Sequence, residues 1–276
     1  MRGTEEPAAN QVISRDGTEI GYFSSGEGPP LILVHGGLGD HSRWDALRPY
    51  LEPEVRVHAM DRRGRGVSGD TLEYDLEREF QDVAAVVDAV AETSGTPVDV
   101  YAHSAGGIYT FGALALTGNI SRIVCYEGWD WVTPEAHVPA PAVLERMEAL
   151  LEADDREGAV EVLFREAIGV TDDELDQVRA QPSWPARVVA AHTVPREVRA
   201  FLETDFAPEH DGNITIPVLF LVGTESPQSW MTDAETVAAA LPDAQISVLE
   251  GQAHSADMLA PELVADKLLT FLQERS

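Results

Sequence analysis

The sequence is poor in cysteine and in lysine. Cys125 is the one cysteine among 276 residues, which excludes an intramolecular disulfide and a cluster of cysteine metal ligands. It stands in an apolar run, so we expect a small buried side chain rather than a reactive thiol. Lys267 is the one lysine, and arginine supplies the remaining basic residues. The chemistry of this chain therefore has to come from residues other than thiols.

Positive charge is also scarce. The chain has 19 Lys and Arg residues against 48 Asp and Glu residues, which gives a formal net charge of −29. Nucleic acids and anionic membranes bind to basic surfaces, so this balance argues against both as partners. We expect a small molecule as the binding partner, and the sequence leaves the oligomeric state open.

Long hydrophobic runs are absent as well. The first residues, MRGTEEPAANQ, do not contain the apolar centre of a signal peptide. No apolar run approaches the length of a membrane span. The default expectation is a soluble, cytoplasmic protein.

Short apolar runs of strand length are present in both end regions of the chain, where they alternate with helical patterns. A hairpin is predicted across Asp16-Gly17, a favoured tight-turn pair. Further strands are predicted over residues 31–34, 55–60, 98–102, 120–126, 217–222 and 245–249. Helical periodicity separates them, most clearly over residues 76–91. This alternation predicts an α/β fold with a mostly parallel, eight-stranded sheet flanked by helices.

The middle of the chain has a different pattern. Between residues 130 and 213 no strand is predicted, and helical patterns follow one another. Thr171 and Glu174 have the spacing of a capping box, which marks the start of one of these helices. We expect residues 130–213 to form an all-helical cap, inserted into a core that comprises residues 1–129 and 214–276.

A glycine-rich segment, Gly64 to Gly69, matches the G-x-G-x-x-G pattern of dinucleotide-binding loops. Such a loop requires a helix to start directly at its last glycine. Here residues 70–74 intervene before the next helical pattern. We therefore predict no nucleotide cofactor.

The stretch Ala102-His103-Ser104-Ala105-Gly106 ends a predicted strand and precedes a helical pattern. Strand, small-x-Ser-x-small, helix is the layout of a nucleophile elbow. The tight turn requires small residues two positions before and after Ser104, and Ala102 meets this need in place of the more usual glycine. Such a turn lifts the serine hydroxyl above the sheet edge. The N–H of Ala105, at the start of the helix, points at the same spot.

Four segments, in this order, resemble the α/β-hydrolase fold family. His35-Gly36-Gly37 resembles the oxyanion loop of the family, Asp61 to Ser68 its fourth-strand loop, and Ala102 to Gly106 its nucleophile elbow. Gly251 to His254, after the last predicted strand, resembles the loop that carries the catalytic histidine. The resemblance covers nearly the whole chain and implies the α/β-hydrolase fold.

The resemblance also implies roles for single residues. Ser104 is the expected nucleophile, and His254 is the base that takes its proton. The backbone N–H groups of Gly37 and Ala105 form the expected oxyanion hole, where each donor stabilises the tetrahedral intermediate by about 3 kcal/mol. An acid is needed as well, to orient the imidazole of His254.

Two glutamates are candidates for that acid. In most family members an Asp stands three residues after the glycine that follows the penultimate strand. Here that glycine is Gly223, the third residue on is Ser226, and Glu225 lies one position early. The other known location is the end of the strand after the elbow helix, where this chain has Glu127, in a way that resembles the zearalenone-lactonase branch. We expect Glu127 to be the acid and keep Glu225 as the alternative.

Aromatic residues cluster in the segments that are expected to surround the site. Together with loop residues they predict a mostly apolar pocket, which suits a neutral, fairly lipophilic ester or lactone. The residues expected to bind substrate are Gly36, Leu38, His103, Trp129, Trp131 and Trp184.

The function expected from these residues is that of a serine hydrolase. It would cleave a carboxylic ester or lactone through a Ser-His-Glu triad and an acyl-enzyme, with no cofactor and no metal. The same triad serves C–C bond hydrolysis, lyase chemistry and cofactor-free peroxidase chemistry in members of this family, and these remain alternatives. A non-catalytic ligand-binding member of the fold is a third hypothesis.

Overall fold

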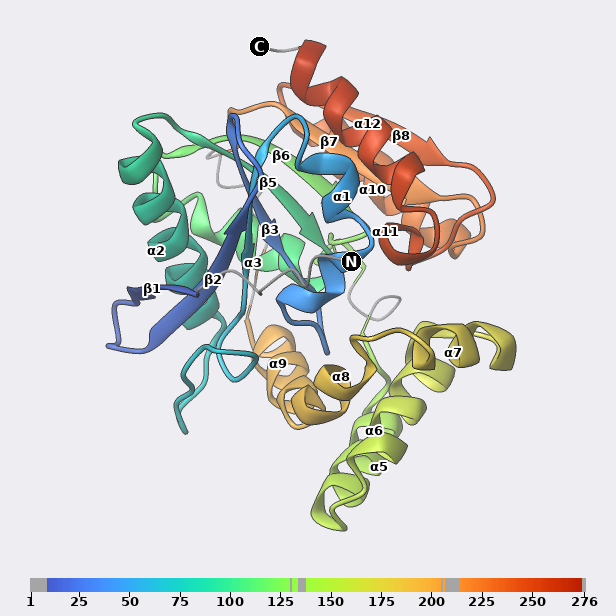
Figure 1. Cartoon of the computed structure of the whole chain (residues 1–276). Helices are drawn as coiled ribbons and strands as arrows, with labels where there is room; N and C mark the ends of the chain where they lie inside the picture. Colours follow the sequence, from blue (N-terminus) through green and yellow to red (C-terminus); the bar gives the residue numbers. More distant parts are fainter. Residues whose placement is uncertain (1–8, 130, 134–137, 205, 207–213, 275–276) are drawn as a thin grey trace, which may run out of the picture.

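The structure, a computed structural model, describes residues 9–129, 131–133, 138–204, 206 and 214–274. Eight strands form one sheet in the order β1-β2-β4-β3-β5-β6-β7-β8 (Figure 1). The first two strands run antiparallel to their neighbours, and all other pairs are parallel. This confirms the predicted sheet. The strands are β1 (Asn10–Ile13), β2 (Glu19–Ser25), β3 (Pro30–Val34), β4 (Arg56–Met60), β5 (Val98–His103), β6 (Ile120–Tyr126), β7 (Val218–Gly223) and β8 (Ala244–Leu249).

The helices of the core cover both faces of this sheet. They are η1 (His41–Asp45, a 3₁₀ helix), α1 (Arg48–Leu51), α2 (Leu76–Ser94), α3 (Ala105–Ala113), α10 (Gln228–Ala240), α11 (Ala256–Leu259) and α12 (Pro261–Glu274). The sequence pattern did not predict α11, because its four residues are too few for a periodicity to appear.

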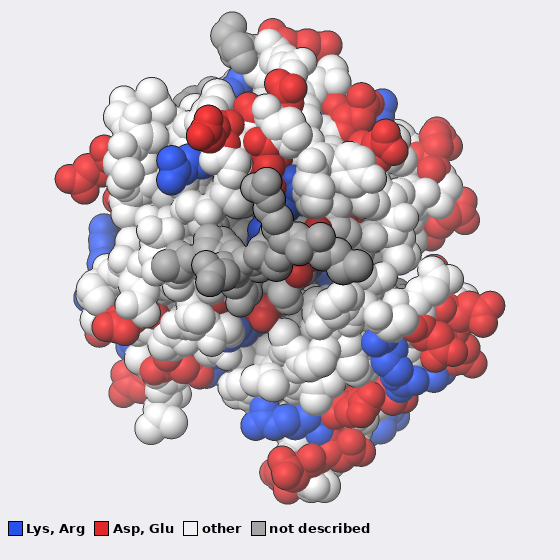
Figure 2. Space-filling model, viewed as in Figure 1, with Lys and Arg blue, Asp and Glu red and all other residues white. Residues whose placement is uncertain are grey.

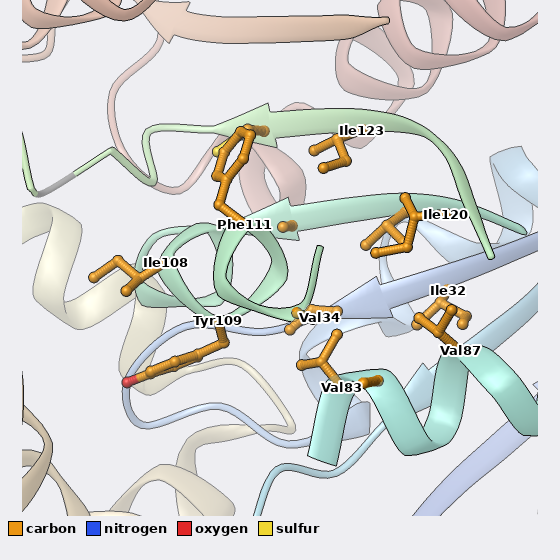
Figure 3. Packing of buried hydrophobic residues seen from close by; sticks show 14 of the residues in the cluster. Ile32, Val34, Val83, Val87, Ile108, Tyr109, Phe111, Ile120 and Ile123 are labelled. Atoms are coloured by element: carbon orange, nitrogen blue, oxygen red, sulfur yellow. The ribbon is translucent and has the colours of Figure 1, made fainter. Parts of the chain in front are cut away.

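Strand β3 shows why both faces of the sheet need a cover. Successive side chains of a strand point to opposite faces, and here Ile32 and Val34 enter one apolar cluster while Leu31 and Leu33 enter another. All four are completely buried. Helices α2, α3 and α10 pack on the first cluster, and η1, α1 and α12 pack on the second. Figure 3 shows side chains of α2, α3, β3 and β6 meeting in the first cluster.

Local signals determine where the longest helix begins and ends. Asp75 caps α2 by accepting a hydrogen bond from the N–H of Arg78 at 2.9 Å. Gly95 ends the helix in the left-handed region with φ 72°, a conformation that glycine adopts without strain.

Cys125, on strand β6, is fully buried, as its apolar surroundings in the sequence predict.

Between β6 and β7 the described residues form five α-helices and one π-helix and no strand. We call residues 141–202 the helical insertion. Figure 1 shows it as a separate layer at the bottom of the view. The capping box of Thr171 and Glu174 is present at the start of α7. The elements are α5 (Pro141–Glu152), α6 (Arg156–Val162), η2 (Leu163–Ile168, the π-helix), α7 (Asp172–Arg179), α8 (Trp184–Ala190) and α9 (Thr193–Leu202).

A buried ion-pair network ties the insertion to the core. Glu197 of α9 pairs with Arg62, at 3.1 Å, and with Arg65. Arg65 also donates to the hydroxyl of Thr193 at 2.7 Å, and Arg62 pairs with Glu79 at 2.8 Å. Burial by itself would raise the pKa of Glu197, but the charges of the two arginines outweigh burial and lower the pKa to about 2. The carboxylate is therefore ionised and holds α9 against the loop after β4.

The acidic side chains are spread around the face seen in Figure 2 rather than gathered in one patch. Among the described residues, no helix is both long enough and apolar enough to cross a membrane.

Candidate active site

Ser104 lies on a sharp turn between β5 and α3. Its backbone has φ 54° and ψ −136°, which is a strained conformation for a residue other than glycine. The neighbouring chain is very close: a Cβ added at Gly106 would lie 2.4 Å from the carbonyl oxygen of Val34, and one at Gly36 would lie 2.6 Å from Cβ of Ser104. The turn therefore requires small residues around the serine, and this strained geometry is that of a nucleophile elbow.

His254 and Glu127 are in contact. His254 lies in the loop after β8, and its Nδ1 is 2.7 Å from Oε2 of Glu127. The second carboxylate oxygen, Oε1, accepts hydrogen bonds from the N–H of Gly223 at 2.9 Å and from the hydroxyl of Ser226 at 2.6 Å. Only 2% of Glu127 is exposed, and a buried carboxylate is costly without such hydrogen-bond partners.

Of the two candidate acids, Glu127 is the one against His254 in the described part of the chain. It comes directly after β6 with φ 47°, so the strained backbone turns its side chain toward the imidazole. Glu225 is exposed, and its backbone N–H donates to the carbonyl of Gln252 at 2.8 Å. The contact of Ser226 with Glu127 was not predicted, although its position three residues after Gly223 was the available signal.

The loop that carries His254 is held from several sides. Nε2 of His103 lies 2.8 Å from the carbonyl oxygen of His254, and the hydroxyl of Tyr126 donates to the carbonyl of Ala253. The rings of Trp230 and His254 meet edge to face with centroids 4.9 Å apart. Burial lowers the pKa of His103 well below its usual value, so its imidazole is neutral. Nη2 of Arg43 also lies 3.1 Å from Nε2 of His103. These contacts fix the position of the His254 ring.

Ser104 and His254 open onto the same cavity, which has a volume of about 130 Å³. Residues of the core line one part of it, including Leu38, His103 and Trp230. The helical insertion contributes apolar side chains of η2 and α9, together with the charged Arg187 and Glu197. The π-helix η2 is a departure from expectation, because the periodicity predicts one α-helix over residues 156–168. Such wide turns occur often at functional sites, and η2 here contributes cavity-lining residues.

The backbone N–H groups predicted for the oxyanion hole lie on this cavity. Ala105 begins α3, and the first N–H groups of a helix have no acceptor within the helix. The N–H of Gly37 has no acceptor within the described residues. The loop of Gly37 is shaped by His35, whose Nδ1 donates to the carbonyl of Gly36 at 2.9 Å and whose Nε2 accepts from the N–H of Arg62 at 3.2 Å. Both Gly37 and Ala105 are cavity-lining residues.

Four residues expected to bind substrate are not among the described residues that line this cavity, and the expectation is corrected for them. They are Trp129, Trp131, Trp184 and Gly36. Trp129 is fully buried, packs on Phe220 and donates its indole N–H to the carbonyl of Trp230 at 3.2 Å. Trp131 packs on Phe111 in the apolar cluster under α3. These two side chains stabilise the loop after β6 from beneath, because that loop turns them toward the core.

Trp184 and Gly36 are the other two. Trp184 packs inside the insertion, near Phe164, and donates its indole N–H to Glu157 at 3.1 Å. Gly36 lies behind Ser104, where its lack of a side chain makes room for the serine. Leu38 and His103, the remaining two expected residues, do line the cavity.

Asp40, His41 and Asp61 place potential metal-ligand atoms within 4.8 Å of one another. Hydrogen bonds within the protein already use these groups. Asp61 accepts from the backbone N–H of His41 at 2.7 Å and of Val67 at 2.9 Å, and Asp40 accepts from the N–H of Ser42 at 2.9 Å. The arrangement braces two turns, and we assign no metal to it.

Sequence reasoning missed two arginines on the cavity, Arg43 and Arg187. Arg43 forms two hydrogen bonds with Asp257, at 2.8 and 3.0 Å. No local motif marks these residues, since they come from η1 and α8, far apart in the sequence. Only the tertiary structure brings them to the cavity.

Comparison with known proteins places the chain among hydrolases. The sequence model of the alpha/beta hydrolase family matches residues 31–267. The (E)-2-((N-methylformamido)methylene)succinate hydrolase of Acinetobacter baylyi is 26% identical over 260 residues, which cover 91% of this chain and 93% of that protein. A non-heme haloperoxidase of Rhodococcus erythropolis is 27% identical over 289 residues, covering 95% and 98%. The crystal structure of an alpha/beta hydrolase from Sphaerobacter thermophilus has 34% identity, covers 95% of this chain and 100% of its own, and superposes with a TM-score of 0.80.

Proposed function

The chain belongs to the alpha/beta hydrolase family, and from that premise we propose that it is a serine hydrolase that cleaves a carboxylic ester or lactone. One observation carries the proposal. Ser104, on a strained turn, and His254, bound through Nδ1 to buried Glu127, open onto one cavity. These are the parts that a hydroxyl nucleophile needs.

The proposed reaction begins with attack of Ser104 Oγ on the carbonyl carbon of the substrate. His254 takes the hydroxyl proton on Nε2, and the N–H groups of Gly37 and Ala105 receive the negative charge that forms on the carbonyl oxygen. Collapse of the tetrahedral intermediate releases the alcohol, which takes the proton from His254, and leaves an acyl-enzyme. Water, deprotonated by His254, then attacks the acyl carbon and frees Ser104.

Glu127 acts in this scheme as the orienting acid. Its contact with Nδ1 keeps the proton of neutral His254 on that nitrogen, which leaves Nε2 free to accept the proton of Ser104. The hydrogen bonds from Gly223 and Ser226 hold the carboxylate in that direction. The buried position of Glu127 strengthens the interaction with the imidazolium that forms during the reaction.

The helical insertion serves in this proposal as the cap of the site, with residues 130–213 as its full extent. Support comes from the cavity, which the core loops and the insertion line together. The apolar side chains of η2 and α9 exclude water from the part of the cavity that they line, and they favour a lipophilic substrate.

A second candidate is cofactor-free peroxidase chemistry with the same residues. The observation that favours it is the relationship to a protein named non-heme haloperoxidase. Ser104, assisted by His254, would form an acyl-enzyme with a carboxylic acid and release water. Hydrogen peroxide instead of water would then attack the acyl carbon, which gives a peracid and frees Ser104. Turnover of halide in the presence of peroxide and acetate distinguishes this reaction from ester hydrolysis.

The experiment that tests the proposal combines a substrate panel with covalent labelling. We expect the protein to hydrolyse p-nitrophenyl esters and a fluorophosphonate probe to label Ser104. Ser104→Ala is expected to lose labelling and to lower turnover by at least about 10³-fold. Ester turnover by a protein that the probe does not label would contradict an acyl-enzyme on Ser104.

A further inference from the structure

Arg187 differs from the other arginines that are buried in the described part of the chain. Each of the others forms an ion pair with a carboxylate. These pairs are Arg43 with Asp257, Arg62 with Glu79, Arg63 with Asp82 and Arg65 with Glu197. No carboxylate among the described residues forms an ion pair with Arg187, although only 3% of it is exposed.

The contacts that Arg187 does make are weak for a cation. One terminal nitrogen, Nη2, lies 3.1 Å from the thioether sulfur of Met258, which is a poor acceptor. The guanidinium carbon lies 5.6 Å from the centre of the Phe164 ring. The Nε atom is fully buried and has no hydrogen-bond partner in the described parts of the chain. A buried charge with such partners is costly for the fold, so its presence points to a function.

The charges around the cavity make this arginine a site for an anion. Burial and the nearby charge of Arg43 lower the pKa of Arg187 to about 9, which leaves the guanidinium charged at neutral pH. Of the described acids, Asp257 and Asp40 act on this charge, and both oxygens of Asp257 are already bonded to Arg43. Neither acid forms an ion pair with Arg187 at this end of the cavity.

We propose that Arg187 binds a carboxylate of the substrate, so that the substrate is an ester or lactone that also carries a free carboxylic acid. Arg187 lines the cavity that also holds Ser104 and His254, so one small molecule reaches both the cation and the nucleophile. A guanidinium binds a carboxylate through two parallel hydrogen bonds, which fixes direction as well as charge. This inference rests on the proposed function and narrows its substrate class.

The remaining lining residues indicate which part of the substrate lies between Ser104 and Arg187. The insertion contributes the apolar Leu163, Phe164, Val194 and Phe201. It also contributes Glu197, whose charge is already paired with Arg62 and Arg65. A substrate of this kind has a short apolar body with the scissile ester at one end and the acid at the other. The neutral substrate expected from the tryptophans is replaced by an anionic one, because the buried cation was not visible in the sequence pattern.

The test compares half-esters of dicarboxylic acids with neutral analogues. Mono-p-nitrophenyl succinate, glutarate and adipate are each paired with the same compound methylated on its free carboxyl group. For at least one chain length, we expect kcat/KM for the acid to exceed that for its methyl ester by about 10-fold or more. In Arg187→Met this ratio should fall to about 1 or below.

A matched variant separates this effect from a general loss of positive charge on the insertion. Arg199 lies on α9 and pairs with Glu148 at 2.7 Å, away from the cavity. Arg199→Met should keep the acid-to-ester ratio of the wild type within about twofold. If Arg187 had only a structural role, Arg187→Met would lower turnover of both substrates alike and leave the ratio unchanged, which would overturn the inference.

A binding measurement distinguishes failure of this inference from failure of the proposed hydrolysis. Ser104→Ala protein is titrated calorimetrically with monomethyl glutarate and dimethyl glutarate, with and without Arg187→Met. We expect the half-ester to bind about 10-fold or more tightly than the diester, and only when Arg187 is present. Such binding without ester turnover by the wild type would reject the hydrolase and keep the carboxylate site. If kcat/KM were the same for the acid and its methyl ester at all three chain lengths, the carboxylate site would be rejected, whatever the rate of hydrolysis.

Discussion

The hydroxyl of Ser226 donates a 2.6 Å hydrogen bond to Oε1 of Glu127. Ser226 stands three residues after Gly223, at the position where most members of the family carry an aspartate. The carboxylate against His254 comes instead from the end of β6. Ser226, at the usual acid position, therefore still takes part in the site, because it donates a hydrogen bond that holds the carboxylate of Glu127.

The first prediction concerns the choice of acid. Glu127→Gln should lower kcat by about 10³-fold or more, because the amide can donate to Nδ1 and so favour the wrong tautomer of His254. Glu225→Gln should cost less than about tenfold, because Glu225 is exposed. Steady-state kinetics with a p-nitrophenyl ester check both, after circular dichroism shows that each variant is folded. The reverse ranking would assign the acid to Glu225.

The second prediction uses the position of Ser226. In Glu127→Gln, adding Ser226→Asp should restore activity by about tenfold or more. The reason is that position 226 is close enough for its serine to contact Glu127, so an aspartate there places an acid beside His254 again. Ser226→Asp alone should lower activity, since two carboxylates would then face each other in a buried site. Kinetics of the two single variants and the double variant form the test. A double variant no more active than Glu127→Gln would show that this position no longer reaches His254.

The third prediction concerns the elbow. Gly106→Ala should lower the midpoint of thermal unfolding by several degrees and abolish labelling of Ser104, because the new Cβ would lie 2.4 Å from the backbone oxygen of Val34. The matched control is Gly118→Ala, where a Cβ would meet nothing within 4 Å. Thermal denaturation and fluorophosphonate labelling measure the two effects. Normal labelling of Gly106→Ala would show that the turn has more room than the structure indicates.

The fourth prediction concerns the pH dependence of stability. The pKa of Glu197 is about 2 in the folded protein, below its usual value of 4.5. A depressed acid pKa contributes stability above the unfolded value, and this contribution is lost as the pH falls from about 4.5 toward 2. Glu197→Gln should therefore lower stability by about 3 kcal/mol at pH 7, where it leaves Arg65 unpaired. The difference from the wild type should shrink between pH 5 and pH 3.

Thermal unfolding at pH 7, 5 and 3 measures that difference. The control is Glu203→Gln, at the exposed end of α9, which should follow the wild type at every pH. A gap between Glu197→Gln and the wild type that stays constant down to pH 3 would mean that the ion pairs of Glu197 contribute little to stability.

Periodicity and turn chemistry act over a few neighbouring residues, so the sequence by itself determined most of the elements and their order, apart from α11 and the π-helix η2. The apolar run 120–126 is β6, and the spacing of Thr171 and Glu174 is the capping box of α7. The carboxyl ends of parallel strands meet at one edge of a sheet, which is why the sequence predicts that Ser104, Glu127 and His254 lie together. Glu127 could be preferred over Glu225 because it follows its strand directly.

Only the tertiary structure decided where side chains point and which of them have no partner among the described residues. Trp129 and Trp131 flank the site in sequence but turn into the core, because the direction of a loop side chain depends on packing from distant elements. That no described carboxylate pairs with Arg187 is likewise a property of the fold, since it shows only when elements from distant parts of the chain are packed together. Local physical chemistry determines the elements along the chain, whereas the contacts between elements determine the chemistry of the cavity.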